Sequence, residues 1–368
     1  MAKLLRALGL MSGTSMDGID VAMVTTDGED KIERGPSETY PYPPEFRAQL
    51  AEAIADAKPI TERKQRPGCL GAVERALTQH HAVAVTDFLR ETGIDPASLD
   101  IMGFHGQTVL HKPAEKLTVQ LGDGPLLAKL TAIDVVYDLR AADVAMGGQG
   151  APLVPIYHRA LAARVPGRPV AFLNLGGVGN VTWIGTLGGP LAFDTGPGNA
   201  LIDDWVRQHT GQSHDVDGTL ALQGKVDEAA LTQLLRHPYF GKLPPKSLDR
   251  NAFDMGRVSH LSLEDGAATL TAFTARSVKQ AVPLLPDPPV TWIICGGGRR
   301  NKALMLALSS ELDAAVAPAE VLGLNGDSLE AEAWAYLAVR SLRQLPVSFP
   351  MTTGVAAPIT GGLLARAC

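Results

Sequence analysis

The sequence lacks any run of about 20 consecutive apolar residues, the length that a helix needs to cross a bilayer. The apolar stretch at the N-terminus is interrupted at Gly9 and Ser12, so we expect a first strand there instead of a signal peptide. Cysteine is scarce, and Cys69, Cys295 and Cys368 lack the spacing of metal ligands. These absences predict a reduced, cytoplasmic protein without a membrane partner.

Other absences exclude common nucleotide-binding classes and one class of partner. The Gly-x-x-x-x-Gly-Lys-Ser/Thr loop of P-loop enzymes and the Gly-x-Gly-x-x-Gly fingerprint of dinucleotide-binding folds do not occur. The formal net charge is −6, which weighs against a nucleic-acid partner. No low-complexity tract or charge block divides the 368 residues, a length that suits two lobes of roughly 150–200 residues.

Glycine, in contrast, is abundant, with 38 residues that fall in tight clusters. Such clusters are typical of loops where the backbone comes close to a ligand. Apolar runs of strand length alternate with segments of helical spacing, which indicates an α/β fold. We expect an N-terminal lobe at 1–135, a second lobe at 136–340, and a C-terminal segment at 341–368 that returns to the first lobe.

The expected elements follow from these patterns. Strands are predicted at 4–11, 21–26, 101–104, 118–121, 133–137, 170–175, 181–184 and 291–295. Helices are predicted at 45–58, 70–92, 126–130, 157–163, 200–209, from 301 onward, and at 330–342.

Two segments, 12–18 and 176–180, repeat one pattern of apolar strand, polar glycine loop and apolar strand. A tight hairpin of small residues exposes several backbone N–H groups in one direction, and such a nest binds phosphate oxygens. The alternative is a plain hairpin turn in which glycine supplies the positive φ. Because the pattern occurs twice and a third glycine loop lies at 296–298, a nucleotide is the favoured ligand.

Side chains of the first loop add further ligand chemistry. Thr14 and Ser15 offer hydroxyl donors beside the backbone nest. Asp17 and Asp20 are candidate Mg²⁺ ligands, because this ion prefers carboxylate oxygens and water.

The third glycine loop, Gly296 to Gly298, follows an apolar strand and precedes a helical segment. Bare backbone at this place can seat an adenosine, or it can simply allow a strand and a helix to pack closely. The loop by itself does not decide between these two interpretations.

Asp194 follows an apolar strand and precedes the segment Thr195–Asn199, which opens a helix. A carboxylate at this position is well placed to act as a general base. The alternative is a helix N-cap, although Asn199 and Asp203 are closer to the helix start. We therefore favour the catalytic interpretation.

A further set of polar residues is a candidate for contact with a substrate. His105 and Gln107 end an apolar strand, where α/β proteins place ligand contacts, although a lone histidine is often structural. Arg140 and Asp143 are three residues apart and can form a surface ion pair or hydrogen-bond a sugar ring. Glu330 begins a helix, where its charge suits the helix dipole, and ligand contact is the alternative.

Read together, several motifs resemble those of the anhydro-N-acetylmuramic acid kinase family, in the family's order and over residues 9 to about 340. They are Gly9-Leu-Met-Ser-Gly-Thr-Ser-Met-Asp-Gly-Ile-Asp20, Phe104-His-Gly-Gln-Thr108, Gly147-Gly-Gln-Gly-Ala-Pro-Leu153, Asn174-Leu-Gly-Gly-Val-Gly-Asn180, Phe193-Asp-Thr-Gly-Pro-Gly-Asn199 and Cys295-Gly-Gly-Gly298.

The resemblance implies the two-lobed fold of sugar kinases, actin and heat-shock-70 ATPases, with ATP in a cleft between the lobes. It implies that ATP, water and 1,6-anhydro-N-acetylmuramic acid give N-acetylmuramic acid 6-phosphate and ADP, a step of peptidoglycan recycling. By motif match Asp194 is the base that activates water for attack at the anomeric carbon. The expected ligands of ATP and Mg²⁺ are Gly13, Thr14, Ser15, Met16, Asp17, Gly18, Ile19, Asp20, Gly176, Gly177, Asn180, Gly296, Gly297 and Gly298. The expected sugar contacts are His105, Gln107, Arg140, Asp143 and Glu330.

Two places depart from the family pattern. Gly179 stands where alanine or serine is expected, and residues 245–250 keep Lys-Ser and Arg but lack the expected Thr-Gly and Glu. If that loop touches the sugar, the substrate side departs more than the ATP side. The alternatives are a kinase of the same fold for another sugar and a nucleotide-dependent, non-catalytic muropeptide sensor. Oligomeric state, including a homodimer, is left open.

Overall fold

The computed structural model describes residues 3–13 and 15–367, which form two compact units. Unit 1 contains the described residues up to Ala163 and those from Ser328 onward, and unit 2 is Arg164–Asp327. We expected a division near residue 135, whereas the chain leaves unit 1 after Ala163 and re-enters it at Ser328. The difference arises because residues 136–163 pack with unit 1: the Tyr157 hydroxyl donates to the buried Glu332 carboxylate at 2.6 Å.

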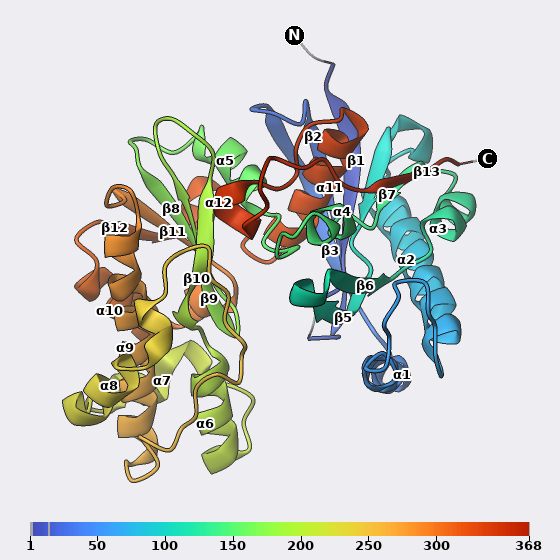
Figure 1. Ribbon diagram of the computed structural model, residues 1–368. Helices are drawn as coiled ribbons and strands as arrows, with labels where there is room; N and C mark the ends of the chain where they lie inside the picture. The colour runs from blue at the N-terminus through green and yellow to red at the C-terminus, as the bar shows by residue number, and fades with distance from the viewer. Residues whose placement is uncertain (1–2, 14, 368) are drawn as a thin grey trace. The chain divides into compact units, whose positions relative to one another are not determined.

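Unit 1 is built on a sheet whose first strands form an antiparallel meander, followed by parallel strands (Figure 1). Its strand order is β13 (Leu363–Ala365), β7 (Val135–Tyr137), β4 (Ile101–Phe104), β1 (Leu5–Met11), β2 (Gly18–Thr26) and β3 (Ile32–Pro41). A separate hairpin pairs β5 (Gln107–Lys112) with β6 (Leu117–Leu121). The C-terminal segment thus supplies an antiparallel edge strand to the first sheet.

Unit 2 repeats the same strand pattern. Its order is β10 (Leu191–Pro197), β9 (Val178–Ile184), β8 (Val170–Leu175), β11 (Thr291–Cys295) and β12 (Ala315–Pro318). In both units the first strand pairs antiparallel with the second and parallel with a later strand. The two candidate phosphate loops therefore occupy equivalent places, between β1 and β2 and between β8 and β9.

Helices cover these sheets. Those of unit 1 are α1 (Pro44–Asp56), α2 (Leu70–Thr92), α3 (Gly124–Thr131), α4 (Ala141–Ala145), α5 (Pro155–Ala162), α11 (Leu329–Leu342) and α12 (Pro350–Thr353). Those of unit 2 are α6 (Ala200–Thr210), α7 (Thr219–Gln223), α8 (Glu228–Leu235), α9 (Leu263–Ala281) and α10 (Lys302–Glu311). Within the described residues, no helix combines the length and the apolar character needed to cross a membrane.

The alternation of side chains along β1 decides which helix packs on which face of its sheet. Leu8 and Leu10 join the core formed with α1, α2 and α3. Gly9, between them, faces α11 so closely that a Cβ atom would lie 1.7 Å from the Ala331 carbonyl oxygen. Gly103 in β4 has the same relation to the Trp334 carbonyl oxygen, at 2.0 Å. These two glycines let α11 lie directly on β1 and β4 (Figure 1).

Candidate active site

The loop between β1 and β2 is a tight turn. The Met16 N–H donates to the Gly13 carbonyl oxygen at 3.1 Å, and Met16 has a φ of 55°, in the left-handed region. The Ser15 hydroxyl donates to Asp17 Oδ1 at 2.7 Å. Thr14, one of the expected ligands, lies outside the described residues. The geometry is that of a turn with polar side chains on its outside.

The carboxylates of this loop differ in their surroundings. Asp17 is exposed, and Asp20 is half-buried, where its Oδ1 accepts from the Thr39 hydroxyl at 2.6 Å. Between them Gly18 and Ile19 are buried in β2, so they support the loop from beneath. Mg²⁺ is usually held by one or two carboxylates together with water and phosphate oxygens, and this donor set fits that requirement.

Buried polar groups lie directly behind the loop. The Ser12 hydroxyl donates to Gln107 Oε1 at 3.0 Å. It is also hydrogen-bonded to the Tyr42 hydroxyl at 2.8 Å. The Gln107 Nε2 amide is buried with no partner among the described residues. A buried donor without a partner costs free energy, which singles out this amide as a group that a ligand would satisfy.

The buried His105 and the half-buried Arg140 form a pair. The Arg140 Nε and Nη2 atoms lie 3.2 and 3.1 Å from His105 Nε2, and the guanidinium stacks on the Trp334 ring at 5.0 Å. Burial, and then the charge of Arg140, hold the pKa of His105 well below its usual range. The imidazole is therefore neutral: Nε2 accepts from Arg140, and Nδ1–H donates to the Ser12 carbonyl oxygen at 3.2 Å. Burial also lowers the pKa of Arg140 to about 10. Because this value is still well above neutral pH, the guanidinium remains cationic there.

Asp143 lies behind this pair and is fully buried. Its Oδ2 accepts from the Gly150 N–H at 2.6 Å, and its Oδ1 accepts from the Thr353 hydroxyl at 2.6 Å. Within the described part of the chain it forms no ion pair with Arg140, whose Nη1 instead donates to the Gly150 carbonyl oxygen at 2.9 Å. Both side chains thus fix the glycine loop that follows α4.

Glu330 stands in the first turn of α11 and is exposed. Desolvation raises the pKa of its carboxyl group, the charge of Arg140 lowers it, and the charge of Asp20 raises it. The structure therefore brings Glu330, Arg140 and Asp20 into one electrostatic neighbourhood at the end of the unit 1 sheet.

In unit 2 the two glycine loops lie against each other. A Cβ atom on Gly296, whose φ is 72°, would lie 2.3 Å from the Asn174 side chain, and one on Gly298 would lie 2.6 Å from Leu175 Cβ. The carbonyl oxygens of Gly176 and Gly177 accept from backbone N–H groups at the start of α6. Gly297 lies between these positions in a short 3₁₀ helix.

Asp194 lies within β10, beside a bulge in its pairing with β9. The Asn180 side-chain amide donates to Oδ1 at 2.8 Å, and the Leu248 N–H donates to Oδ2 at 2.7 Å. Burial raises the pKa of this carboxyl, while these two hydrogen bonds and the charge of Lys246 act in the opposite direction. The carboxylate is therefore oriented by donors and is not a cap of α6.

Several side chains and main-chain groups that contact His105, Arg140 and Asp194 were not predicted from the sequence. Ser12 and Trp334 position His105 and Arg140, while Tyr239 and Leu248 contact Asp194. The signal that pointed to one of them was the departure from the family pattern at residues 245–250.

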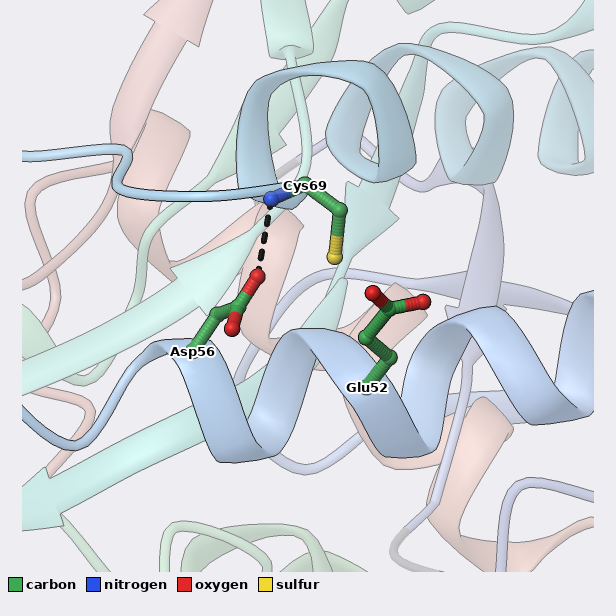
Figure 2. A group of neighbouring side chains, drawn as sticks. All are labelled: Glu52, Asp56 and Cys69. Atoms are coloured by element: carbon green, nitrogen blue, oxygen red, sulfur yellow. Dashed lines mark hydrogen bonds between the residues drawn. The ribbon is translucent and has the colours of Figure 1, made fainter.

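One group of possible metal ligands lies elsewhere in unit 1. Figure 2 shows Glu52 and Asp56 of α1 beside Cys69, whose N–H donates to Asp56 at 2.9 Å. Partial burial and the Asp56 carboxylate raise the pKa of the Cys69 thiol, which disfavours the thiolate that binds metals. Among the described residues this is the one group of three such side chains, and it does not include the candidate active site.

Comparisons with known proteins find relatives over nearly the whole chain. The family model of anhydro-N-acetylmuramic acid kinase matches residues 5–366. Curated relatives of that name include one from Rhodopseudomonas palustris, 54% identical over 99% of this chain and 100% of its own length, and one from Methylobacterium nodulans, 53% identical over 98% and 100%.

A solved structure, (R)-2-hydroxyglutaryl-CoA dehydratase component A from Acidaminococcus fermentans, is 10% identical and covers 92% of this chain and 99% of its own. Its TM-score of 0.51 supports the fold alone. The expected fold class, the two-lobed α/β fold of the sugar kinase and actin group, is confirmed, and so is the resemblance to the kinase family. The relatives do not favour the alternative of another sugar or a non-catalytic sensor. The chain belongs to the anhydro-N-acetylmuramic acid kinase family.

Proposed function

We propose that Asp194 is the general base of the sugar kinase reaction of this chain. One observation carries the proposal: a half-buried carboxylate is oriented by Asn180 and Leu248 through one donor on each oxygen. Each carboxylate oxygen offers more than one lone-pair site, so both can still accept from a water molecule. Burial raises the pKa of the group, which makes the carboxylate a stronger base.

The reaction of the family balances around this base. Asp194 takes a proton from water as the water oxygen bonds to the anomeric carbon of the 1,6-anhydro sugar, and the bond from that carbon to the bridge oxygen breaks. The bridge oxygen, now O6, bonds to the γ-phosphorus of ATP, and ADP leaves. The proton on Asp194 passes to solvent, so N-acetylmuramic acid 6-phosphate and ADP are the products.

Residues of unit 1 supply the polar contacts that we assign to the sugar. Gln107 offers an unpaired amide donor, and Arg140 is a cation held rigidly between His105 and the Trp334 ring. The neutral His105 fixes the guanidinium without adding a second positive charge. Glu330, exposed at the start of α11, is the remaining group that we assign to the substrate. Asp143 acts through the loop that it holds, because Gly150 and Thr353 each occupy one of its oxygens.

The glycine loops are assigned to the nucleotide. Because the carbonyl oxygens of Gly176 and Gly177 are already engaged, the loop would meet phosphate through N–H groups. Gly296 to Gly298, which lie against Asn174 and Leu175, are assigned to the adenosine. Asp17 and Asp20 would hold Mg²⁺, which neutralises charge on the transferring phosphoryl group. We place this reaction in the cytoplasm, with a small amino sugar as the partner.

The reaction is tested by turnover with 1,6-anhydro-N-acetylmuramic acid, ATP and Mg²⁺ in ¹⁸O-labelled water. Mass spectrometry of brief reactions should find the label at the anomeric hydroxyl, because water attacks that carbon. Label in the phosphate would show that water attacks phosphorus instead. An equal reaction with another anhydro sugar would show that the substrate is wrong.

A further inference from the structure

Residues 246–248, in the segment that departs from the family pattern, run beside Asp194 through main-chain contacts. The Asp194 N–H donates to the Lys246 carbonyl oxygen at 3.0 Å, and the Leu248 N–H donates to Asp194 Oδ2 at 2.7 Å. Lys246 and Leu248 are half-buried, whereas Ser247 between them is exposed. This alternation is that of an extended segment with every second side chain turned toward the protein. The segment therefore holds the carboxylate in place.

The Lys246 ammonium lies against two aromatic rings. Its Nζ lies 4.6 Å from the Tyr239 ring centroid and 5.6 Å from that of Phe193, and it approaches the Tyr239 carbonyl oxygen at 3.4 Å. Such rings attract a cation through their electron-rich faces. The Tyr239 ring is also tied to the base, because its hydroxyl donates to the Asp194 carbonyl oxygen at 2.6 Å. The cation is thus fixed close to the base.

This cation does not occupy the carboxylate. Within the described residues, Lys246 forms no ion pair within 4.0 Å, and the donors to the two Asp194 carboxylate oxygens are Asn180 and Leu248. A direct ion pair would compete with water for the lone pairs that a base needs. A cation held at a distance favours the ionised carboxylate and leaves those lone pairs accessible.

From these contacts we propose that Lys246 is a positioning residue for Asp194: its carbonyl oxygen fixes the Asp194 main chain, and its ammonium, held against the Tyr239 and Phe193 rings, favours the ionised carboxylate. The proposal rests on the proposed role of Asp194 as the base. It assigns the altered 245–250 segment to the base, and not to direct recognition of the sugar.

Other polar and titratable groups surround Asp194 and Lys246. Tyr239 faces it from the 3₁₀ helix at Pro238–Gly241, and burial raises the pKa of that phenol, so it remains a neutral donor. Asn180 on β9 is neutral. Desolvation, and to a smaller extent the charge of Lys242, lower the pKa of Lys246. Lys246 is therefore the cation whose charge opposes the effect of burial on Asp194.

The test compares Lys246→Met and Lys246→Arg with the unaltered full chain, by kcat/KM as a function of pH. Loss of the charge should move the acidic limb of the profile upward by about half to one pH unit. Lys246→Arg should restore most of this difference, because it keeps the cation. The control is Lys242→Met, an exposed lysine that precedes residues 245–250 and whose charge acts on Lys246 and not on Asp194, so the limb should stay in place.

A second measurement keeps the test independent of turnover. The ¹³C shift of the Asp194 carboxyl, followed against pH, should show the same upward move in Lys246→Met, or in Lys246→Gln if the first variant does not fold. An unmoved carboxyl titration in a folded variant would overturn the proposal, even where Asp194→Asn is inactive. If Asp194→Asn instead retains turnover, the proposed base is wrong, so the two failures are distinguishable.

Discussion

Acidification should destabilise unit 1 through its buried histidines, and His81 provides the sharpest case. The ring is fully buried in α2, its Nδ1–H donates to the Leu77 carbonyl oxygen at 2.8 Å, and it packs on Phe104 at 4.8 Å. Its Nε2 has no partner among the described residues, so a proton there would place an unpaired charge in the core. Burial lowers the pKa of His81 to about 4.

The sign and size of the effect follow from this lowered pKa. Below about pH 6.5 the unfolded chain binds a proton that the folded chain refuses, so stability falls as the pH falls toward about 4. At about pH 5 the ordinary pKa is about 1.5 units away, which corresponds to about 2 kcal/mol of lost stability from this group. His105 and His158 act with the same sign.

The assay is urea unfolding of the unaltered chain and of His81→Met at about pH 7.5 and about pH 5. The substitution removes packing and a hydrogen bond at both pH values. It also removes the cost of keeping the buried ring neutral, which matters only at about pH 5. The stability difference between the two proteins should therefore shrink by about 2 kcal/mol on acidification. The titration of carboxyl groups cancels in the stability difference between the two proteins, because both contain the same carboxyl groups. A difference that changes by less than about 0.5 kcal/mol would show that His81 does not contribute to acid destabilisation.

Three further predictions concern the core. Gly9→Ala should cost about 3 kcal/mol or more in urea unfolding, because its Cβ would lie 1.7 Å from the Ala331 carbonyl oxygen; a near-neutral result would show that α11 moves easily. Arg34→Met should cost about 3–5 kcal/mol by the same assay, because it leaves the Glu332 carboxylate buried without its cation, and a smaller loss is expected when Glu332→Gln is added. Burial raises the pKa of Cys295 to about 12, so mass spectrometry should find it unmodified by iodoacetamide in the folded chain and modified in urea.

Much of the fold could be predicted because its central elements carry strong local signals. The helix predicted at 70–92 is α2 with the same bounds, and the apolar runs at 101–104 and 170–175 are β4 and β8. By contrast, β3 is an edge strand with mostly polar, exposed residues, so it gave no hydrophobic pattern. Helix α9 was missed although Ser262 caps it and acidic residues occupy its first turn, which are recognisable start signals.

The candidate site shows where sequence reasoning ends. Asp194 could be selected because a carboxylate at the end of an apolar strand is a local pattern. Its partners could not, since Tyr239 and Leu248 are 45 and 54 residues away along the chain and meet it through the folded backbone. The neutral state of His105 likewise depends on burial and on Arg140, which no local spacing reveals.

The proposed role of Asp194 as the base is tested most directly by measuring the turnover of Asp194→Asn together with its binding of ligands. The amide keeps the shape of the side chain and removes its basicity, while the glycine loops are unchanged. Calorimetry should find ADP–Mg²⁺ and sugar bound almost normally, while turnover falls by at least about a hundredfold. The matched control is Asp287→Asn, an exposed residue of unit 2, which should keep its turnover. If Asp194→Asn turns over at the rate of the unaltered chain, Asp194 is not the base and the account is contradicted.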